Sequence, residues 1–161
     1  MEYPMSKLML IDGNSILNRA FYGLSGGSML TTSKGLYTNA VFAFINILNK
    51  HLDELAPEYI AVAFDMKAKT FRHQMYDGYK AQRKGMPDEL AMQLPLIKEV
   101  LAAMNIPIVE REGYEADDII GSLSLKGEKE NLDVLILTGD RDSFQLVSDK
   151  TVILYPSTKG G

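Results

Sequence analysis

The sequence contains no cysteine and only two histidines among its 161 residues. Without cysteine there are no disulfides and no thiolate ligands, and His51 and His73 are too few for a histidine-rich zinc site. Charges interrupt every apolar stretch before it could cross a bilayer, and the N-terminus lacks the basic-then-apolar order of a signal peptide. We therefore expect a cytoplasmic protein with no membrane segment and no zinc.

The length, with 46% hydrophobic residues, suits one domain over residues 1–161 with a sizeable core. The formal net charge is −4, an excess of four acidic residues over basic ones, and the seven carboxylates discussed below outnumber that excess. Removing these seven from the 21 acidic residues leaves 14 against 17 basic ones. An acidic pocket in an otherwise slightly basic shell suits a metal-dependent enzyme that acts on a polyanion.

Three apolar runs predict buried strands, and each run delivers a carboxylate just past its carboxyl end. Ligands of open α/β sheets bind at that edge. Gathered carboxylates raise one another's pKa, so they cost several kcal/mol unless protons or cations neutralise them. The runs are residues 7–11, 59–64 and 134–139, and the acids that follow them are Asp12, Asp65, Asp140 and Asp142.

Three further acids, Glu115, Asp117 and Asp118, stand at a predicted helix start. Helical geometry puts Glu115 and Asp118 on one face and Asp117 about 100° away, so the group can serve two ions. Carboxylate ligands without sulfur or nitrogen favour two Mg²⁺ or Mn²⁺ ions, which suit phosphodiester hydrolysis. Taken alone, the three acids fit an ordinary acidic first turn that complements the helix dipole.

The remaining pattern alternates strands with helices and predicts a three-layer α/β domain with a mainly parallel central sheet. Asn14 or Ser15 is the predicted N-cap of the first helix, and Thr38 or Asn39 that of the second. Pro95 predicts a kink in a helix over residues 88–104. The other predicted elements are strands at residues 106–109 and 151–155, a helix from residue 115 and a short helix near residues 143–147.

Residues 66–86 form a basic segment interleaved with aromatic rings. Cations that contact phosphates and rings that stack on bases hold single strands without reading sequence. Lys80 and Arg83, three apart, could stabilise charge on a scissile phosphate. A solvated surface helix is the simpler interpretation of this segment alone. The candidate DNA-binding residues are Arg72, Tyr76, Tyr79 and Lys84 here, with Arg19 on phosphate and Tyr22 on a base nearer the N-terminus.

Five motifs together resemble the 5′-nuclease domain at the start of bacterial DNA polymerase I, within the flap-endonuclease family. The resemblance covers residues 7 to about 155. The motifs are Asp12-Gly-Asn-Ser, Phe71-Arg72, Tyr79-Lys80-Ala81-Gln82-Arg83, Gly113-Tyr114-Glu115-Ala116-Asp117-Asp118 and Thr138-Gly139-Asp140-Arg141-Asp142.

The resemblance implies a PIN-like fold and Mg²⁺-dependent 5′→3′ hydrolysis of DNA with a 5′ flap, a nick or a free 5′ end, in replication and repair. It implies that the seven carboxylates hold the ions. It also implies that Arg72, Lys80 and Arg83 engage the 5′ strand from a helical arch. The chain stops at Gly161, before the family's further acidic pair and helix-three-turn-helix motif, so we expect weak cleavage by the isolated chain.

Two other functions fit parts of the pattern. A PIN-domain ribonuclease uses a similar acidic pocket on RNA, although the basic, aromatic segment argues against it. A non-catalytic module that binds metal and DNA needs fewer carboxylates than the seven in this chain. The sequence does not indicate an oligomeric state.

Overall fold

The structure is a computed structural model that describes residues 4–23, 30–66 and 85–156. Five strands form one sheet in the order β3-β2-β1-β4-β5, and each neighbouring pair is parallel. The strands are β1 (Lys7–Asp12), β2 (Tyr59–Ala63), β3 (Ile108–Val109), β4 (Asp133–Leu137) and β5 (Thr151–Leu154). The helices are α1 (Gly13–Gly23), α2 (Asn39–Leu55), α4 (Asp88–Ala91), α5 (Gln93–Ala103), α6 (Ala116–Lys129) and the 3₁₀ helix η1 (Arg141–Leu146).

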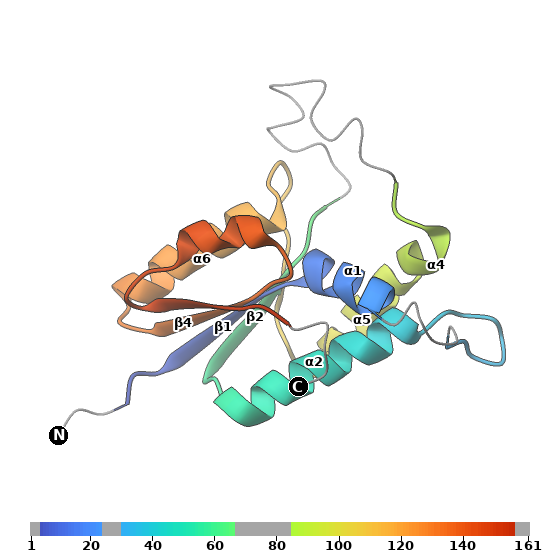
Figure 1. Cartoon of the computed structure of the whole chain (residues 1–161), viewed down its shortest axis with the longest axis horizontal. Coiled ribbons are helices and arrows are strands. Elements are labelled where there is room, and N and C mark those ends of the chain that lie inside the picture. The colour runs from blue at the N-terminus through green and yellow to red at the C-terminus, as the bar shows by residue number, and fades with distance from the viewer. Residues whose placement is uncertain (1–3, 24–29, 67–84, 157–161) are drawn as a thin grey trace.

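Side chains of β1 alternate between two buried faces of the sheet, as strand geometry requires. Met9 and Ile11 pack in a core cluster with residues of α1, α2 and α5, whereas Leu10 packs in a second cluster with residues of α6. Figure 1 shows α6 over one face of the sheet and α1, α2 and α5 on the other side. Burial on both faces explains the continuous apolar runs and confirms the predicted three-layer α/β fold.

The strand order creates a reversal next to β1. From β1 the chain proceeds to β2 and β3 on one side, and it then places β4 and β5 on the other side. In open α/β sheets, a crevice for ligands opens at the carboxyl ends of the strands where the order reverses in this way. The topology therefore points to the carboxyl ends of β1, β2 and β4.

The predicted helix over residues 88–104 is two helices, and the predicted kink at Pro95 is wrong. The break lies at Met92, between α4 and α5. Pro95 falls in the first turn of α5, where a backbone N–H would have no intrahelical acceptor. The proline therefore fits the helix start without bending it.

Gln93 takes the place of the predicted cap of α2. Thr38 makes no side-chain capping bond. Instead, Oε1 of the fully buried Gln93 accepts hydrogen bonds from the backbone N of Ala40 at 2.8 Å and of Val41 at 3.1 Å. Its Nε2 donates to Oδ1 of Asn39 at 2.8 Å. This contact joins α5 to the start of α2, so a residue far along the chain satisfies the helix end.

Helix α1 begins earlier than predicted. Gly13 is its first residue, directly after β1, and the backbone N of Ser15 donates to Oδ1 of Asp12 at 3.1 Å. Asp12 therefore caps the helix in place of Asn14 or Ser15. A Cβ at Gly13 would lie 2.4 Å from the ring of Phe64, so only glycine fits this tight strand-to-helix step.

Across the described ranges, no helix combines the length and apolar character needed to cross a membrane.

Candidate metal centre

Three strands place aspartates beside the reversal in strand order. Asp12 is the last residue of β1, Asp65 follows the end of β2 by two residues, and Asp140 follows the end of β4 by three. Because β1 lies between β2 and β4, the three carboxylates come to the same edge of the sheet. The strands formed by the three apolar runs therefore end at one edge of the sheet, as predicted.

A cavity of about 150 Å³ opens at this edge, and six of the seven predicted carboxylates line it. We call it the acid cavity. A second cavity of about 510 Å³ shares Glu115, Asp117 and Asp142 with it. The acid cavity is lined by Asp12, Asn14, Ser15, Asn18, Asp65, Glu115, Ala116, Asp117, Asp140 and Asp142. The second cavity is lined by Glu115, Asp117, Asp118, Arg141, Asp142, Ser143, Gln145 and Leu146.

The three acids at the start of α6 are arranged around the two cavities differently from the prediction. Glu115 has extended backbone and caps the helix: its side chain accepts from the backbone N of Asp118, while Oδ2 of Asp118 accepts from the N of Glu115 at 3.0 Å. Glu115 is therefore outside the helix, so the predicted shared helical face with Asp118 is wrong. Glu115 and Asp117 line the acid cavity, whereas Asp118 lines only the second cavity.

Hydrogen bonds fix both carboxylate oxygens of Asp12. Oδ1 accepts from the backbone N of Ser15, and Oδ2 accepts from Oγ1 of Thr138 at 3.3 Å. Thr138 Oγ1 also accepts from the backbone N of Asp140 at 3.0 Å, and Ser15 Oγ accepts from the N of Gly139 at 2.5 Å. These polar contacts join the ends of β1 and β4 to α1. Sequence reasoning missed Thr138, although a threonine that ends a buried strand is a usable signal.

The other strand-end aspartates are also held by backbone groups. Oδ1 of Asp65 accepts from the backbone N of Ala116 at 2.6 Å, which joins β2 to the start of α6. The backbone N of Asp65 donates to Oδ1 of Asn14 at 2.7 Å. Oδ1 of Asp140 accepts from the N of Asp142 at 2.9 Å. Each of these carboxylates therefore keeps an oxygen in a fixed place and leaves the other for a further ligand.

The acid cavity is electrostatically strained without a cation. Burial raises the pKa of the Asp12 carboxyl to about 8, and the negative charges of Asp117 and Asp65 add to the rise. The pKa of Asp117 is also raised, by burial and by the charges of Asp140, Asp65 and Glu115. The cation-free cavity therefore retains a proton near neutral pH.

The donor set fits a hard divalent cation. Carboxylate oxygens and nearby amide and hydroxyl oxygens surround the acid cavity, which is the ligand chemistry of Mg²⁺ and Mn²⁺. A divalent ion would also replace the retained proton as the neutralising charge. Within the described ranges, however, no three acid or histidine side chains are already arranged to hold an ion. Side-chain rotations that bring the repelling carboxylates together would have to accompany binding.

Arg19 and Tyr22 border the site from α1. Both line a third cavity, of about 680 Å³, which shares Ser15, Asn18 and Asp140 with the acid cavity. We call it the arginine cavity, and it is lined by Ser15, Asn18, Arg19, Tyr22, Gly23, Gly139, Asp140, Arg141 and Tyr155. Tyr22 is 55% exposed, and its ring meets Phe21 edge-on with centroids 5.1 Å apart. Arg19 and Tyr22 therefore line a cavity next to the carboxylates, and their DNA-binding roles stay a prediction.

Six other predicted site residues lie outside the described residues, as does the predicted helical arch. They are Arg72, Tyr76, Tyr79, Lys80, Arg83 and Lys84. Asp65 and Met66 precede this segment directly, and Asp65 lines the acid cavity. Asp65, at the acid cavity, is therefore separated by Met66 alone from the residues outside the described ranges.

Comparison with known proteins gives one family and several relatives. The family described as 5′-3′ exonuclease, N-terminal resolvase-like domain, matches residues 7–160. DNA polymerase I of Caldicellulosiruptor bescii is 50% identical over 153 residues, which are 95% of this chain and 18% of that protein. DNA polymerase I of Geobacillus stearothermophilus is 46% identical over 148 residues, covering 92% and 17%. The chain thus spans less than a fifth of the length of these relatives.

Solved structures share the fold at low sequence identity. The T5 5′-exonuclease with bound zinc has a TM-score of 0.65 at 19% identity, covering 92% of this chain and 55% of that one. The bacteriophage T5 D15 flap endonuclease, in a pseudo-enzyme-product complex with DNA and metal ions, has a TM-score of 0.64 at 18% identity, covering 92% and 54%. These similarities extend over almost all of the chain and agree with the predicted PIN-like architecture.

Proposed function

The chain belongs to the 5′-3′ exonuclease family with an N-terminal resolvase-like domain, and we propose that it is a divalent-metal-dependent 5′-nuclease acting on DNA. Its substrates are DNA molecules with a 5′ flap, a nick or a free 5′ end. The observation that carries the proposal is the acid cavity: six carboxylates from β1, the β2 and β4 ends, η1 and the start of α6 line one space of about 150 Å³. That many acids at one sheet edge suit cation binding and exceed what the fold requires.

The proposal assigns two Mg²⁺ or Mn²⁺ ions to the seven carboxylates. Asp12, Asp65 and Asp140 bind from the strand ends, and Glu115 and Asp117 bind from the start of α6, all on the acid cavity. Asp118 and Asp142 bind at the side of the second cavity, which they both line. When bound, divalent ions supply charge neutralisation and Lewis-acid polarisation for phosphodiester hydrolysis.

The chain's own residues orient this donor set. Ser15 and Thr138 hold the two oxygens of Asp12, and Ala116 holds one oxygen of Asp65. Such supporting hydrogen bonds set the direction of ligand lone pairs and commonly control metal affinity. The proton retained by Asp12 has to leave when a cation binds, so metal binding is coupled to pH.

Basic and aromatic residues hold the DNA beside the carboxylates. We assign Arg19 to a backbone phosphate and Tyr22 to a base, because both line the arginine cavity next to the acid cavity. Lys80 and Arg83 stabilise charge on the scissile phosphate, and the remaining residues of the basic segment contact the 5′ strand. The latter set is Arg72, Tyr76, Tyr79 and Lys84.

Cleavage of labelled DNA tests the proposal. A duplex with a 5′ flap, incubated with Mg²⁺, should be cut near the branch, and chelation by EDTA should stop the reaction. Asp140→Asn should lower the rate at least a hundredfold, since a metal ligand contributes several kcal/mol to transition-state stabilisation. Asp53→Asn, an exposed aspartate of α2, is the matched control and should cut at the wild-type rate.

The same assay separates the competing functions. Matched single-stranded RNA and flapped DNA are compared at equal concentrations. Preferential cleavage of the RNA would replace the proposal with a PIN-type ribonuclease. DNA binding without any cleavage, unchanged by Asp140→Asn, would replace it with a non-catalytic binding module.

A further inference from the structure

Two contacts hold the guanidinium of Arg19 against one tyrosine. Nη1 of Arg19 donates a hydrogen bond to the hydroxyl of Tyr155 at 3.2 Å. The guanidinium carbon lies 4.6 Å from the centroid of the same ring, which is cation–π geometry. The edge of Phe144 packs against Tyr155, with centroids 5.8 Å apart and planes at 72°. The guanidinium of Arg19 therefore packs against the Tyr155 ring, which in turn packs against the Phe144 ring.

Tyr155 holds Arg19 without neutralising it. By contrast, the charge of Lys98 is neutralised by a salt bridge to Glu110. No carboxylate lies within salt-bridge distance of Arg19 among residues 4–23, 30–66 and 85–156. Tyrosine is uncharged at neutral pH, and a guanidinium has five N–H donors, of which Tyr155 takes one. Within the described part of the chain, the positive charge and most of the N–H donors of Arg19 therefore stay available to an anion.

The aliphatic stem of Arg19 lies close to the backbone at Gly139. A Cβ at Gly139 would lie 3.3 Å from Cδ of Arg19 and 3.1 Å from Oγ of Ser15, closer than ordinary contacts. Glycine at this position leaves room for the arginine stem to pass over the end of β4. A guanidinium already held against Tyr155 loses less entropy when it binds a ligand than a free one would.

The held guanidinium lies next to the carboxylates. Ser15, Asn18 and Asp140 line both the arginine cavity and the acid cavity, so the two cavities are neighbours. Arg141 lines the arginine cavity as well. A polyanion with one phosphate at the acid cavity would therefore place a neighbouring phosphate near Arg19.

From this geometry we propose that Tyr155 is a positioning residue: it holds Arg19 so that the guanidinium meets a phosphate of the DNA strand next to the cleaved bond. The proposal rests on the function proposed above. Tyr155 contributes through Arg19 and touches no reacting atom. Loss of Tyr155 should weaken substrate binding more than it slows the chemical step.

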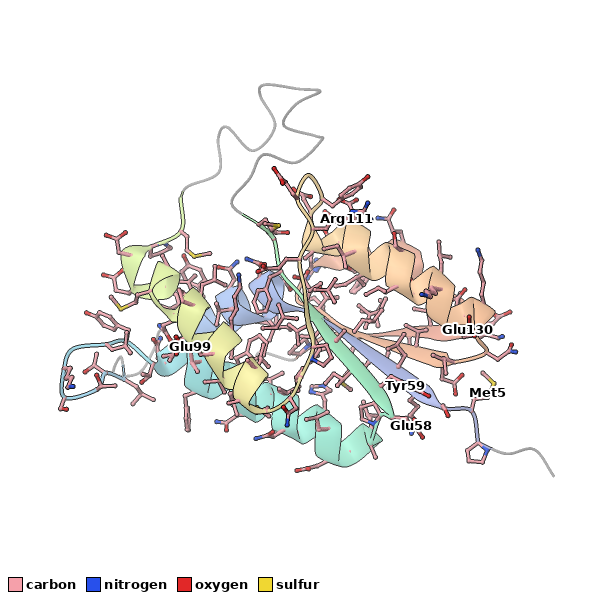
Figure 2. All side chains as sticks on the ribbon, turned by 180° about the vertical axis from the view of Figure 1, so that it is seen from behind. Met5, Glu58, Tyr59, Glu99, Arg111 and Glu130 are labelled. Atoms are coloured by element: carbon pink, nitrogen blue, oxygen red, sulfur yellow. The ribbon has the colours of Figure 1, made fainter. Side chains whose placement is uncertain are left out.

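Two substitutions at Tyr155 separate its two contacts. Tyr155→Phe keeps the ring and removes the hydroxyl, and it should raise the KM for a 5′-flap duplex about threefold, as expected for one hydrogen bond. Tyr155→Leu removes both contacts and should raise KM about tenfold. In both variants kcat should change less than KM. Tyr59→Leu removes an exposed tyrosine at the start of β2, at the end of the strand opposite Asp65, and should leave KM unchanged (Figure 2).

A double-substitution cycle with Arg19 distinguishes positioning from a structural role. Arg19→Ala alone should raise KM at least tenfold, because it removes a charged phosphate contact. Adding Tyr155→Leu to Arg19→Ala should change KM no further, since no guanidinium remains to be positioned. The slope of log KM against log salt concentration should fall by about one unit for Arg19→Ala and by less for Tyr155→Leu.

The outcomes are distinct for this inference and for the proposed function. If the wild-type chain neither binds nor cuts DNA, both are overturned together. If it cuts DNA and Tyr155→Leu has the wild-type KM, only the positioning role is overturned. The same holds if Tyr155→Leu raises KM equally with and without Arg19, because the tyrosine would then act independently of the arginine.

Discussion

Carboxylates near the two ends of β1 have pKa values shifted in opposite directions. At the start of the strand, Oε2 of Glu58 accepts from the backbone N of Lys7 at 2.6 Å, and this bond lowers the pKa of the exposed Glu58 carboxyl. At the end of the strand, burial and neighbouring acids raise the pKa of Asp12 to about 8. Figure 2 shows Glu58 and Tyr59 at the end of β2 away from the start of α6. The fold stabilises charge at one edge and concentrates it at the other.

This difference indicates where the molecule is organised for ligand binding. We call the edge of the sheet at the strand starts the amino edge and the edge at the strand ends the carboxyl edge. At the amino edge Lys7 also donates from Nζ to the backbone O of Leu55 at 3.0 Å, so its charged groups have hydrogen-bond partners within the protein. The carboxyl edge leaves like charges together, which persists in evolved proteins mainly where a ligand compensates for it. The contrast between the edges can be tested with matched substitutions, and the largest effect is expected for activity.

Asp12→Asn and Asp133→Asn form a pair at opposite ends of neighbouring strands. Asp133 starts β4 beside Lys7, whereas Asp12 ends β1. Asp12→Asn should lower Mg²⁺-dependent cleavage of flapped DNA at least a hundredfold, because it removes a proposed metal ligand. Asp133→Asn should cut at close to the wild-type rate. Equal losses from the two substitutions would remove the distinction between the edges.

Cation binding should stabilise the folded protein. A divalent ion at 100 times its dissociation constant adds about 2.7 kcal/mol to the free energy of unfolding. Thermal melts in Mn²⁺ or Mg²⁺ should therefore show a higher Tm than melts in EDTA, and Asp12→Asn should abolish most of the rise. Glu58→Gln, at the amino edge, should leave the cation-induced rise intact. A Tm that ignores the cation would contradict a metal site.

Thr138→Val should produce an intermediate effect. The substitution keeps the shape of the fully buried side chain but removes the hydroxyl that bonds Asp12 and accepts from the backbone N of Asp140. Supporting contacts of this kind commonly change metal affinity about tenfold or more. Titration with Mn²⁺ measures the affinity, and Thr138→Ser, which restores the hydroxyl, should recover it.

The pH dependence of stability without metal gives a further comparison of the two ends of the sheet. The pKa of Asp12 rises from 3.8 to about 8 on folding, so its contribution to stability is complete below pH 3.8 and is lost as the pH rises through about 8. Glu58, with its lowered pKa, contributes above its ordinary value of 4.5 and loses that contribution as the pH falls. Denaturant melts in EDTA from pH 4 to 8 should show the first trend disappear in Asp12→Asn and persist in Glu58→Gln.

The sheet and the gathering of the acids could be predicted from sequence because both follow from local patterns. Residues 8–11 are apolar without interruption, which indicates a strand buried on both faces, and Asp12 follows directly. The parallel topology then brings Asp12, Asp65 and Asp140 together without further information. Pattern and spacing were sufficient wherever the deciding contacts were close in sequence or imposed by the sheet.

The features that sequence reasoning missed depend on contacts between distant residues. Gln93 caps α2 across more than 50 positions, and no local pattern indicates this bond. The hydroxyl of Thr138 reaches Asp12 in the same way, and Tyr155 reaches Arg19. The different positions of Asp117 and Asp118 could have been predicted from the sequence. Glu115 is followed three residues later by Asp118, and such a pair can form a reciprocal helix cap.

A crystal of the chain soaked in Mn²⁺ tests the central claim most directly. The anomalous signal of manganese locates each ion and identifies its ligands. We predict one ion at the acid cavity bound by side chains among Asp12, Asp65, Glu115, Asp117 and Asp140, and a second ion bound by Asp118 and Asp142. A saturating soak that leaves this edge of the sheet without an anomalous peak would contradict the account.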